Sequence, residues 1–474
     1  MGGANHLQNN LTKRIVLLIT ALGAFITPFM SSSVNVALPS ISKELGMSTV
    51  ALNWVALSYT LSTAVFTLPF GRAADILGRK KTMIWGVAVL IAVSALCGFA
   101  INPAMLIIGR ILQGMGSSVA AVNSVSILTS AYPSDERGKV LGLNVAMTYI
   151  GLSTGPYLGG LLTANFGWRS VFFSTIPISI VLLVLLLAIK EEWAGAPGES
   201  FDYRGALIYG IALVGIVWGF SVIHTAWGIA LMAVGLLAAL VFVIFERKIE
   251  DPILDISILL HNRLFSFSSL AALIHYSATS AVSYLFSLYL QYIKGLDPSQ
   301  AGLIMIAQPI MMALFSPMAG KASDRIAPQK VASLGMTITG ISLLSFTFFN
   351  ANTPIPLIVG SLLVLGFGFA LFSSPNTNAV MSSVERKNYG IASGILGASR
   401  TLGQSLSMGI ASLVMVLYVG GKQIGTHNLA RFLTGFKATF VIMTILCVAG
   451  IFASLARGKA SPAGDEKAQS SRQE

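Results

Sequence analysis

The sequence has 474 residues, of which 54% are hydrophobic and only 10% are charged, and its formal net charge is +12 at pH 7. A typical soluble domain is about 25% charged, so this composition excludes a soluble enzyme and indicates a bundle of membrane helices. The basic residues are scattered between apolar runs rather than gathered on one face, which argues against nucleic acid as a partner.

Fourteen segments are apolar and long enough to cross a bilayer, which requires about 20 residues. We therefore predict an all-α membrane protein with 14 transmembrane spans. The expected spans are 15–38, 50–70, 83–100, 104–132, 140–162, 170–189, 205–222, 227–245, 265–292, 301–320, 331–349, 354–378, 390–419 and 438–455.

The distribution of Lys and Arg predicts the orientation of these spans. Placing both termini in the cytoplasm leaves six of the 30 basic residues outside, among them Arg431 and Lys437 in the last outer loop. Cytoplasmic loops of membrane proteins carry an excess of Lys and Arg. We expect a multi-pass protein of the cell (plasma) membrane with both termini cytoplasmic.

An internal repeat divides the chain. The loop GRAADILGRKK, which begins at Gly71, is echoed eight spans later by GKASDRIAPQK, which begins at Gly320. Spans 1 to 6 thus correspond to spans 9 to 14, and secondary transporters build a midplane site between such halves. The predicted domains are a cytoplasmic N-terminus (1–14), a six-helix bundle (15–190), two inserted spans with flanking loops (191–260), a second six-helix bundle (261–456) and a disordered cytoplasmic tail (457–474).

Three motifs follow in order along the first half. They are the loop after span two, RILQGMG from Arg110 in span four, and GLSTGPYLGG from Gly151 in span five. With them the chain resembles the major facilitator superfamily, specifically the drug:proton antiporter branch with fourteen spans, over about residues 14–455. The resemblance implies the major facilitator fold, two six-helix bundles plus two extra helices.

The loop motif pairs glycines with charges. Asp75 can cap a helix N-terminus or pair with Arg79, and the glycines allow helices to approach closely. The resemblance implies a cytoplasmic latch that holds the outward-open state, whereas a merely solvated basic loop is the alternative. The latch residues would be Gly71, Asp75, Gly78, Arg79, Lys80, Gly320 and Asp324.

The motif in span five places Gly151, Gly155 and Gly159 on one helix face, where another helix can pack closely. Pro156 and Gly160 add a bend. The resemblance implies a seal or hinge between the two halves, and ordinary glycine packing remains the alternative.

Span four carries a polar stripe that contains Arg110 and Gln113, and span thirteen repeats it with Arg400 and Gln404. A charge at the bilayer centre costs about 2.5 to 3.5 kcal/mol, so we expect both arginines to face a cavity or a partner rather than lipid. The resemblance assigns Arg110 to proton or substrate coupling, and capping of a neighbour's carbonyls is the alternative.

Other polar residues in spans could line the same pathway or could bind helices together. His275 is the side chain within a span that suits proton exchange near neutral pH, whereas a single His on a helix is more often a hydrogen-bonded structural residue. The remaining candidates are Asn35, Asn144, Tyr149, Gln291, Gln308, Asn376 and Asn378.

The acidic residues depart from the family pattern. Family members usually carry an Asp five residues before the Asn of the first-span motif, and here Met30 occupies that position. All 18 Asp and Glu residues fall in loops or at helix ends. A cavity with two arginines and no carboxylate would favour neutral or anionic amphipathic substrates over lipophilic cations.

We therefore expect a secondary active transporter that exports small amphipathic compounds by alternating access, coupled to protons. Exporters or facilitators of anionic or neutral metabolites without a carboxylate proton site are the main alternative, and a transporter-fold sensor or scaffold is the lesser one. Neither a catalytic set nor a phosphate-binding loop is present, so we expect no enzyme activity, cofactor or metal. Expected partners are membrane lipid, a small-molecule substrate and protons, and the expected state is a monomer.

Overall fold

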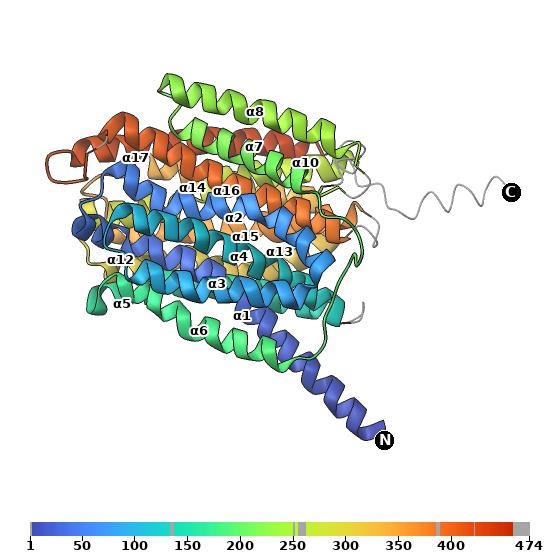
Figure 1. Ribbon diagram of the computed structural model, residues 1–474. Helices are drawn as coiled ribbons and strands as arrows, with labels where there is room; N and C mark the ends of the chain where they lie inside the picture. The colour runs from blue at the N-terminus through green and yellow to red at the C-terminus, as the bar shows by residue number, and fades with distance from the viewer. Residues whose placement is uncertain are drawn as a thin grey trace, which may run out of the picture.

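The computed structural model describes residues 2–132, 137–249, 252–254, 262–384, 389–420 and 422–457, and the regular elements in these ranges are helices. Figure 1 shows them as a bundle of roughly antiparallel rods. The predicted all-α membrane fold is confirmed. By length and composition, 11 helical stretches among the described residues can cross a membrane.

The first half comprises six helices. They are α1 (Gly2–Leu45), α2 (Thr49–Leu77), α3 (Arg79–Gly98), α4 (Pro103–Ala131), α5 (Arg137–Phe166) and α6 (Arg169–Ala188). Two further helices follow, α7 (Tyr203–Ser221) and α8 (Ala226–Glu246). Capping side chains set several of these starts: Asn102 accepts a hydrogen bond from Met105 N ahead of α4, and Asp202 accepts one from Gly205 N at α7.

The second half contains two broken rods followed by four continuous helices. The ninth rod consists of α10 (Arg263–Thr279), α11 (Val282–Leu288) and the π-helix η1 (Tyr289–Ile293), and the tenth consists of α12 (Pro298–Met305) and α13 (Ala307–Arg325). The remaining helices are α14 (Pro328–Phe346), α15 (Ile355–Ser382), α16 (Tyr389–Val419) and α17 (Leu429–Leu455).

The last helix begins nine residues earlier than the sequence predicts. Arg431 and Lys437 therefore belong to α17, and their placement in an outer loop was wrong. Phe432 and Phe436 lie one turn apart on the buried face of this extension, and the Phe436 ring stacks on Tyr289 with 4.9 Å between centroids. This aromatic packing extends the helix beyond the apolar run.

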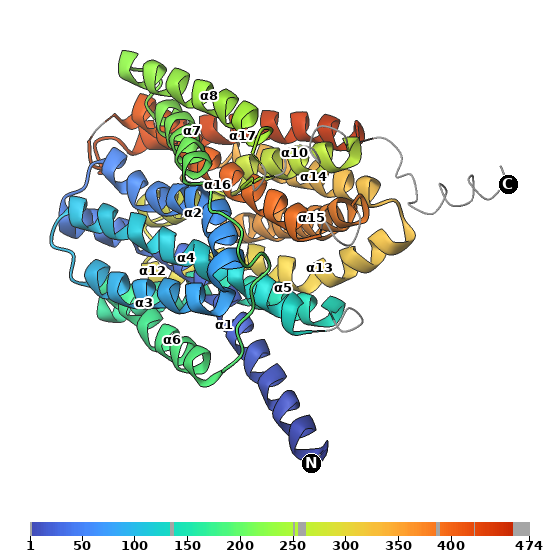
Figure 2. The same cartoon turned by 45° about the vertical axis from the view of Figure 1, so that its right-hand side comes forward.

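The helices α7 and α8 lie outside the two halves, with α8 outermost (Figure 2). Tyr209 Oη on α7 donates to Ala64 O of α2 at 3.2 Å, and the α16 residue Gly409 lies beside Val217 of α7. Helix α7 thus packs on both halves. Helix α8 packs on α7 where Gly215 and Gly235 meet so closely that neither position has room for a side chain.

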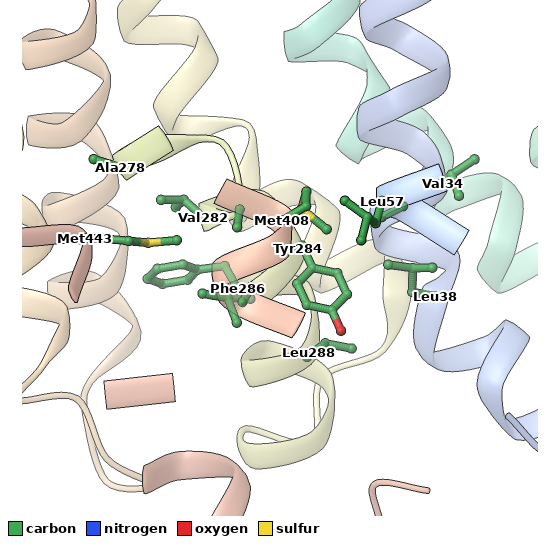
Figure 3. Close-up of a cluster of buried hydrophobic side chains, with 14 of the residues drawn as sticks. Val34, Leu38, Leu57, Ala278, Val282, Tyr284, Phe286, Leu288, Met408 and Met443 are labelled. Carbon is green, nitrogen blue, oxygen red and sulfur yellow. The ribbon is translucent and has the colours of Figure 1, made fainter. Parts of the chain in front are cut away.

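The two halves are closed against each other at the end where α1 finishes and α2 starts. This end lies opposite the one where α1 begins (Figure 1). Figure 3 shows Leu38 of α1, Leu57 of α2, Tyr284 of α11 and Met408 of α16 meeting at this junction. Hydrogen bonds across it run from Ser287 Oγ to Asn35 O (2.6 Å), from Gln291 Nε2 to Val36 O (2.9 Å), from Gln423 Nε2 to Ser42 O (2.9 Å) and from Thr49 N to Lys422 O (3.2 Å).

Candidate functional site

The two predicted arginines occupy different environments. Arg110 is 1% exposed and lies wholly within the first half. Its Nε donates to Val55 O of α2 at 3.0 Å, its Nη1 donates to Gln113 Oε1 at 2.5 Å, and its Cζ lies 4.1 Å from the centroid of the Tyr59 ring. Gln113 Nε2 in turn donates to Ser94 Oγ of α3. This network ties α2, α3 and α4 together inside one half.

Arg400 lies where the halves meet. Its Nη2 donates to Thr377 Oγ1 of α15 at 2.5 Å, whereas its Nε is buried without a hydrogen-bond partner. Its Cζ lies 5.8 Å from the centroid of the Tyr276 ring of α10. Across the junction, Tyr149 Oη of α5 donates to Ser373 Oγ of α15 at 3.3 Å.

We call Tyr149, Tyr276, Phe369, Ser373, Thr377 and Arg400 the junction cluster. Tyr276 and Phe369 pack edge to face with 5.4 Å between centroids, and Met312 of α13 lies in the same buried group. The cluster brings one helix of the first half to three helices of the second half. Sequence reasoning singled out Tyr149 and Arg400 but missed the other four, since their residue types are common in membrane helices.

His275 lies in an aromatic pocket rather than in a polar pathway. It is 0% exposed, its ring stacks on Phe372 with 3.9 Å between centroids, and Phe369 lies 5.0 Å away. In the described part of the chain neither ring nitrogen has a hydrogen-bond partner. In this conformation the described residues therefore give the imidazole no hydrogen-bonded route for a proton.

The remaining predicted polar residues are not gathered at one place. Asn35 and Gln291 flank the closed junction, and Met30 is 2% exposed within an apolar cluster of the first half. Gln308 on α13 and Gln404 on α16 are half-buried. Asn144, Asn376 and Asn378 each donate from Nδ2 to a neighbouring helix. The three acceptors are Thr20 O for Asn144, Ser268 O for Asn376 and Ser323 Oγ for Asn378.

The glycines of span five divide between two neighbours. A methyl group at Gly151, Gly155 or Gly159 would meet α1, because Phe25 O, Ser32 Oγ and Ser33 Cα lie 2.4, 1.9 and 2.7 Å from the added carbon. Gly160 instead faces the second half, with Pro298 O of α12 at 2.2 Å, and Gly302 of α12 faces Pro156 O at 2.1 Å. The edge with Gly151, Gly155 and Gly159 packs within the first half, and the edge with Gly160 contacts the second half.

The loop motif makes its described contacts within the first half and with the segment 189–199. Asp75 accepts from Arg79 Nε at 2.7 Å, and Arg79 Nη1 donates to Ser126 O of α4 at 2.9 Å. The Asp75 carbonyl accepts the backbone N–H groups of residues 195 and 196.

Other latch residues have separate neighbours. Lys80 Nζ donates to Ile189 O, Gly78 adopts φ +108°, and Gly71 faces Val122. In the second half, Gly320 faces Ser374, while the side chain of Asp324 lies outside the described part.

Carboxylates are absent from both arginine environments in the described part of the chain. Its ion pairs join Arg72 to Glu199, Arg79 to Asp75 and Arg169 to Glu44, all at helix ends or in connections. Among the described residues, the guanidinium of Arg400 thus has no acidic partner.

Comparisons with known proteins agree with this architecture. The family model described as Major Facilitator Superfamily matches residues 20–248 and 268–473. The riboflavin transporter RibZ of Clostridioides difficile is 27% identical over 93% of this chain and 96% of its own length. The multidrug resistance protein Stp of Mycobacterium tuberculosis is 29% identical over 86% of this chain and 77% of its own length.

A solved structure shares the fold. It is that of a bacterial homolog of the human lysosomal transporter Spinster, in an inward-facing and unoccupied conformation. It superposes with a TM-score of 0.69 at 15% sequence identity and covers 94% of this chain and 97% of its own.

Proposed function

The chain belongs to the Major Facilitator Superfamily and is a membrane transporter rather than an enzyme, and from this premise we propose that it exports small amphipathic compounds by alternating access. The observation that carries the proposal is the junction cluster. There Tyr149 of the first half bonds to Ser373 and interacts electrostatically with Arg400, whose Thr377 and Tyr276 contacts lie in the second half. A site shared by two halves changes its access when the halves rock. The names of its relatives, a riboflavin transporter and a multidrug resistance protein, support a small-molecule substrate.

The proposal places the protein as a monomer in the plasma membrane with both termini cytoplasmic, in accord with the distribution of basic residues. The closed end of the junction then faces outward, and the conformation described above is the inward-facing one. The loop motif would act as the latch of the opposite state.

In this conformation the His275 ring has an aromatic rather than a polar environment. We propose that outward movement of substrate is exchanged for protons and that His275 takes part once the halves rearrange. A facilitator of anionic or neutral metabolites, without such exchange, is the second candidate, favoured by the absence of a described carboxylate at Arg400.

Transport by purified protein in liposomes tests the proposal. We expect dye accumulation against its gradient when the lumen is acidic, collapse of that accumulation by a protonophore, and loss of the pH response in a His275→Gln variant. Equilibration without accumulation would favour the facilitator. No flux of dye, riboflavin or other small aromatic compounds under either condition would contradict a transport function.

A further inference from the structure

Arg400 differs from Arg110 in how its charge is satisfied. The Arg110 guanidinium is enclosed by a carbonyl, an amide oxygen and a tyrosine face, all from the first half. Among the described residues, Arg400 donates to the hydroxyl of Thr377, and that hydroxyl already donates to Ser373 O at 2.8 Å. A guanidinium has five N–H donors, so Arg400 retains unused donors, among them the buried Nε.

Arg400 is half-buried, with its Nε enclosed. A partly desolvated cation with few partners is stabilised by an anion that accepts its hydrogen bonds. The planar fork of Arg fits a carboxylate or a similar oxyanion through two parallel N–H···O bonds. A lipophilic cation would instead meet an uncompensated like charge.

The neighbours of Arg400 supply flat surfaces. The Tyr276 ring lies 5.8 Å from its Cζ, Phe369 packs on that ring, and the buried Tyr149 belongs to the opposite half. Aromatic side chains bind planar rings by offset stacking or edge-to-face contact. The junction cluster therefore combines one anion-binding group with walls suited to an aromatic ring.

We propose that the junction cluster binds planar aromatic anions, with Arg400 holding the acidic group and Tyr276 and Phe369 contacting the ring. The inference rests on the proposed function and names its substrate class. Because Tyr149 of the first half lies in the same cluster, a bound anion contacts both halves and biases their rocking.

Two dyes with the same tricyclic ring test the charge preference. Fluorescein is an anion and rhodamine 123 is a cation, and binding of each to the purified full-length protein is measured by fluorescence anisotropy. We expect fluorescein to bind at least tenfold more tightly than rhodamine 123. Arg400→Gln is expected to weaken fluorescein binding at least tenfold and to leave rhodamine 123 unchanged or slightly improved. Arg400→Lys should fall between, because it keeps the charge and loses the fork.

Arg431→Gln is the matched control, since Arg431 is exposed on α17 and its replacement changes the net charge equally. It should bind both dyes as the wild type does. The inference is overturned if rhodamine 123 binds the wild type as tightly as fluorescein, if fluorescein does not bind, or if Arg400→Gln keeps wild-type affinity. The wild-type comparison decides the matter even if Arg400→Gln fails to fold.

The binding assay separates this inference from the proposed function. A protein that binds fluorescein selectively but moves no compound in liposomes would contradict transport and leave the anion site in place. A protein that transports rhodamine 123 in preference to fluorescein would contradict the anion site and leave transport in place.

Discussion

Alanine at Gly302 or at Gly160 is expected to slow transport at least several-fold while the protein remains folded. In the closed junction an added methyl carbon would lie 2.1 Å from Pro156 O or 2.2 Å from Pro298 O, both backbone atoms, so α5 and α12 must separate by about 1 Å. Overpacking of this kind costs about 1–3 kcal/mol. If that cost falls on the closed state alone, it shifts the conformational equilibrium roughly 5- to 150-fold.

The measurement is initial transport rate in liposomes, normalised to the amount of folded protein. Gly142→Ala is the control on the same helix, because an added methyl group there meets nothing within 4 Å. It should transport at the wild-type rate. Wild-type rates in both Gly160→Ala and Gly302→Ala would show that the α5–α12 contact does not control the cycle.

Replacement of Arg110 by alanine is expected to destabilise the fold more than replacement of Arg400. The Arg110 side chain is buried, donates to Val55 O and Gln113 Oε1 and packs on the Tyr59 ring, and its removal leaves a cavity and the unpaired Gln113 Oε1. Loss of a large buried side chain costs roughly 2–5 kcal/mol. We expect a lower yield and a melting temperature several degrees below the wild type in detergent.

Arg400→Gln provides the comparison, with a near-normal melting temperature and altered binding. If Arg110→Ala melts as the wild type does but binds or transports substrates differently, the structural role is contradicted and Arg110 belongs to the substrate pathway. Comparing the melting temperature with the binding affinity of the two variants therefore separates the structural role of Arg110 from the binding role of Arg400.

The length of the apolar runs predicted the spans well because runs of about 20 apolar residues leave few alternatives in a membrane. It did not predict which neighbour each helix face meets. Arg110 with Gln113 and Arg400 with Gln404 form the same kind of stripe, yet the first network closes inside one half and Arg400 lies between the halves. A stripe identifies a polar face, whereas its partner depends on how helices distant in sequence assemble.

The same limit applies to the other motifs. The spacing of Gly151, Gly155 and Gly159 predicted close helix contact but could not assign it to α1, nor assign Gly160 to α12. Phe369 and Tyr276 were not distinguished from ordinary apolar residues, because their role depends on the packing of Tyr276 beside Arg400 and of Phe369 on Tyr276.

The rocking of the halves is tested most directly by paired distance measurements between spin labels. One pair replaces the exposed Lys43 and Lys422 by cysteine at the closed end, and the other replaces the exposed Lys81 and Lys330 at the opposite end. The native Cys97 and Cys447 are buried and can be changed to serine. When substrate or a pH change shifts the state, we predict that the first distance lengthens while the second shortens. If the two distances stay constant, or change in the same direction, alternating access about the junction cluster is contradicted.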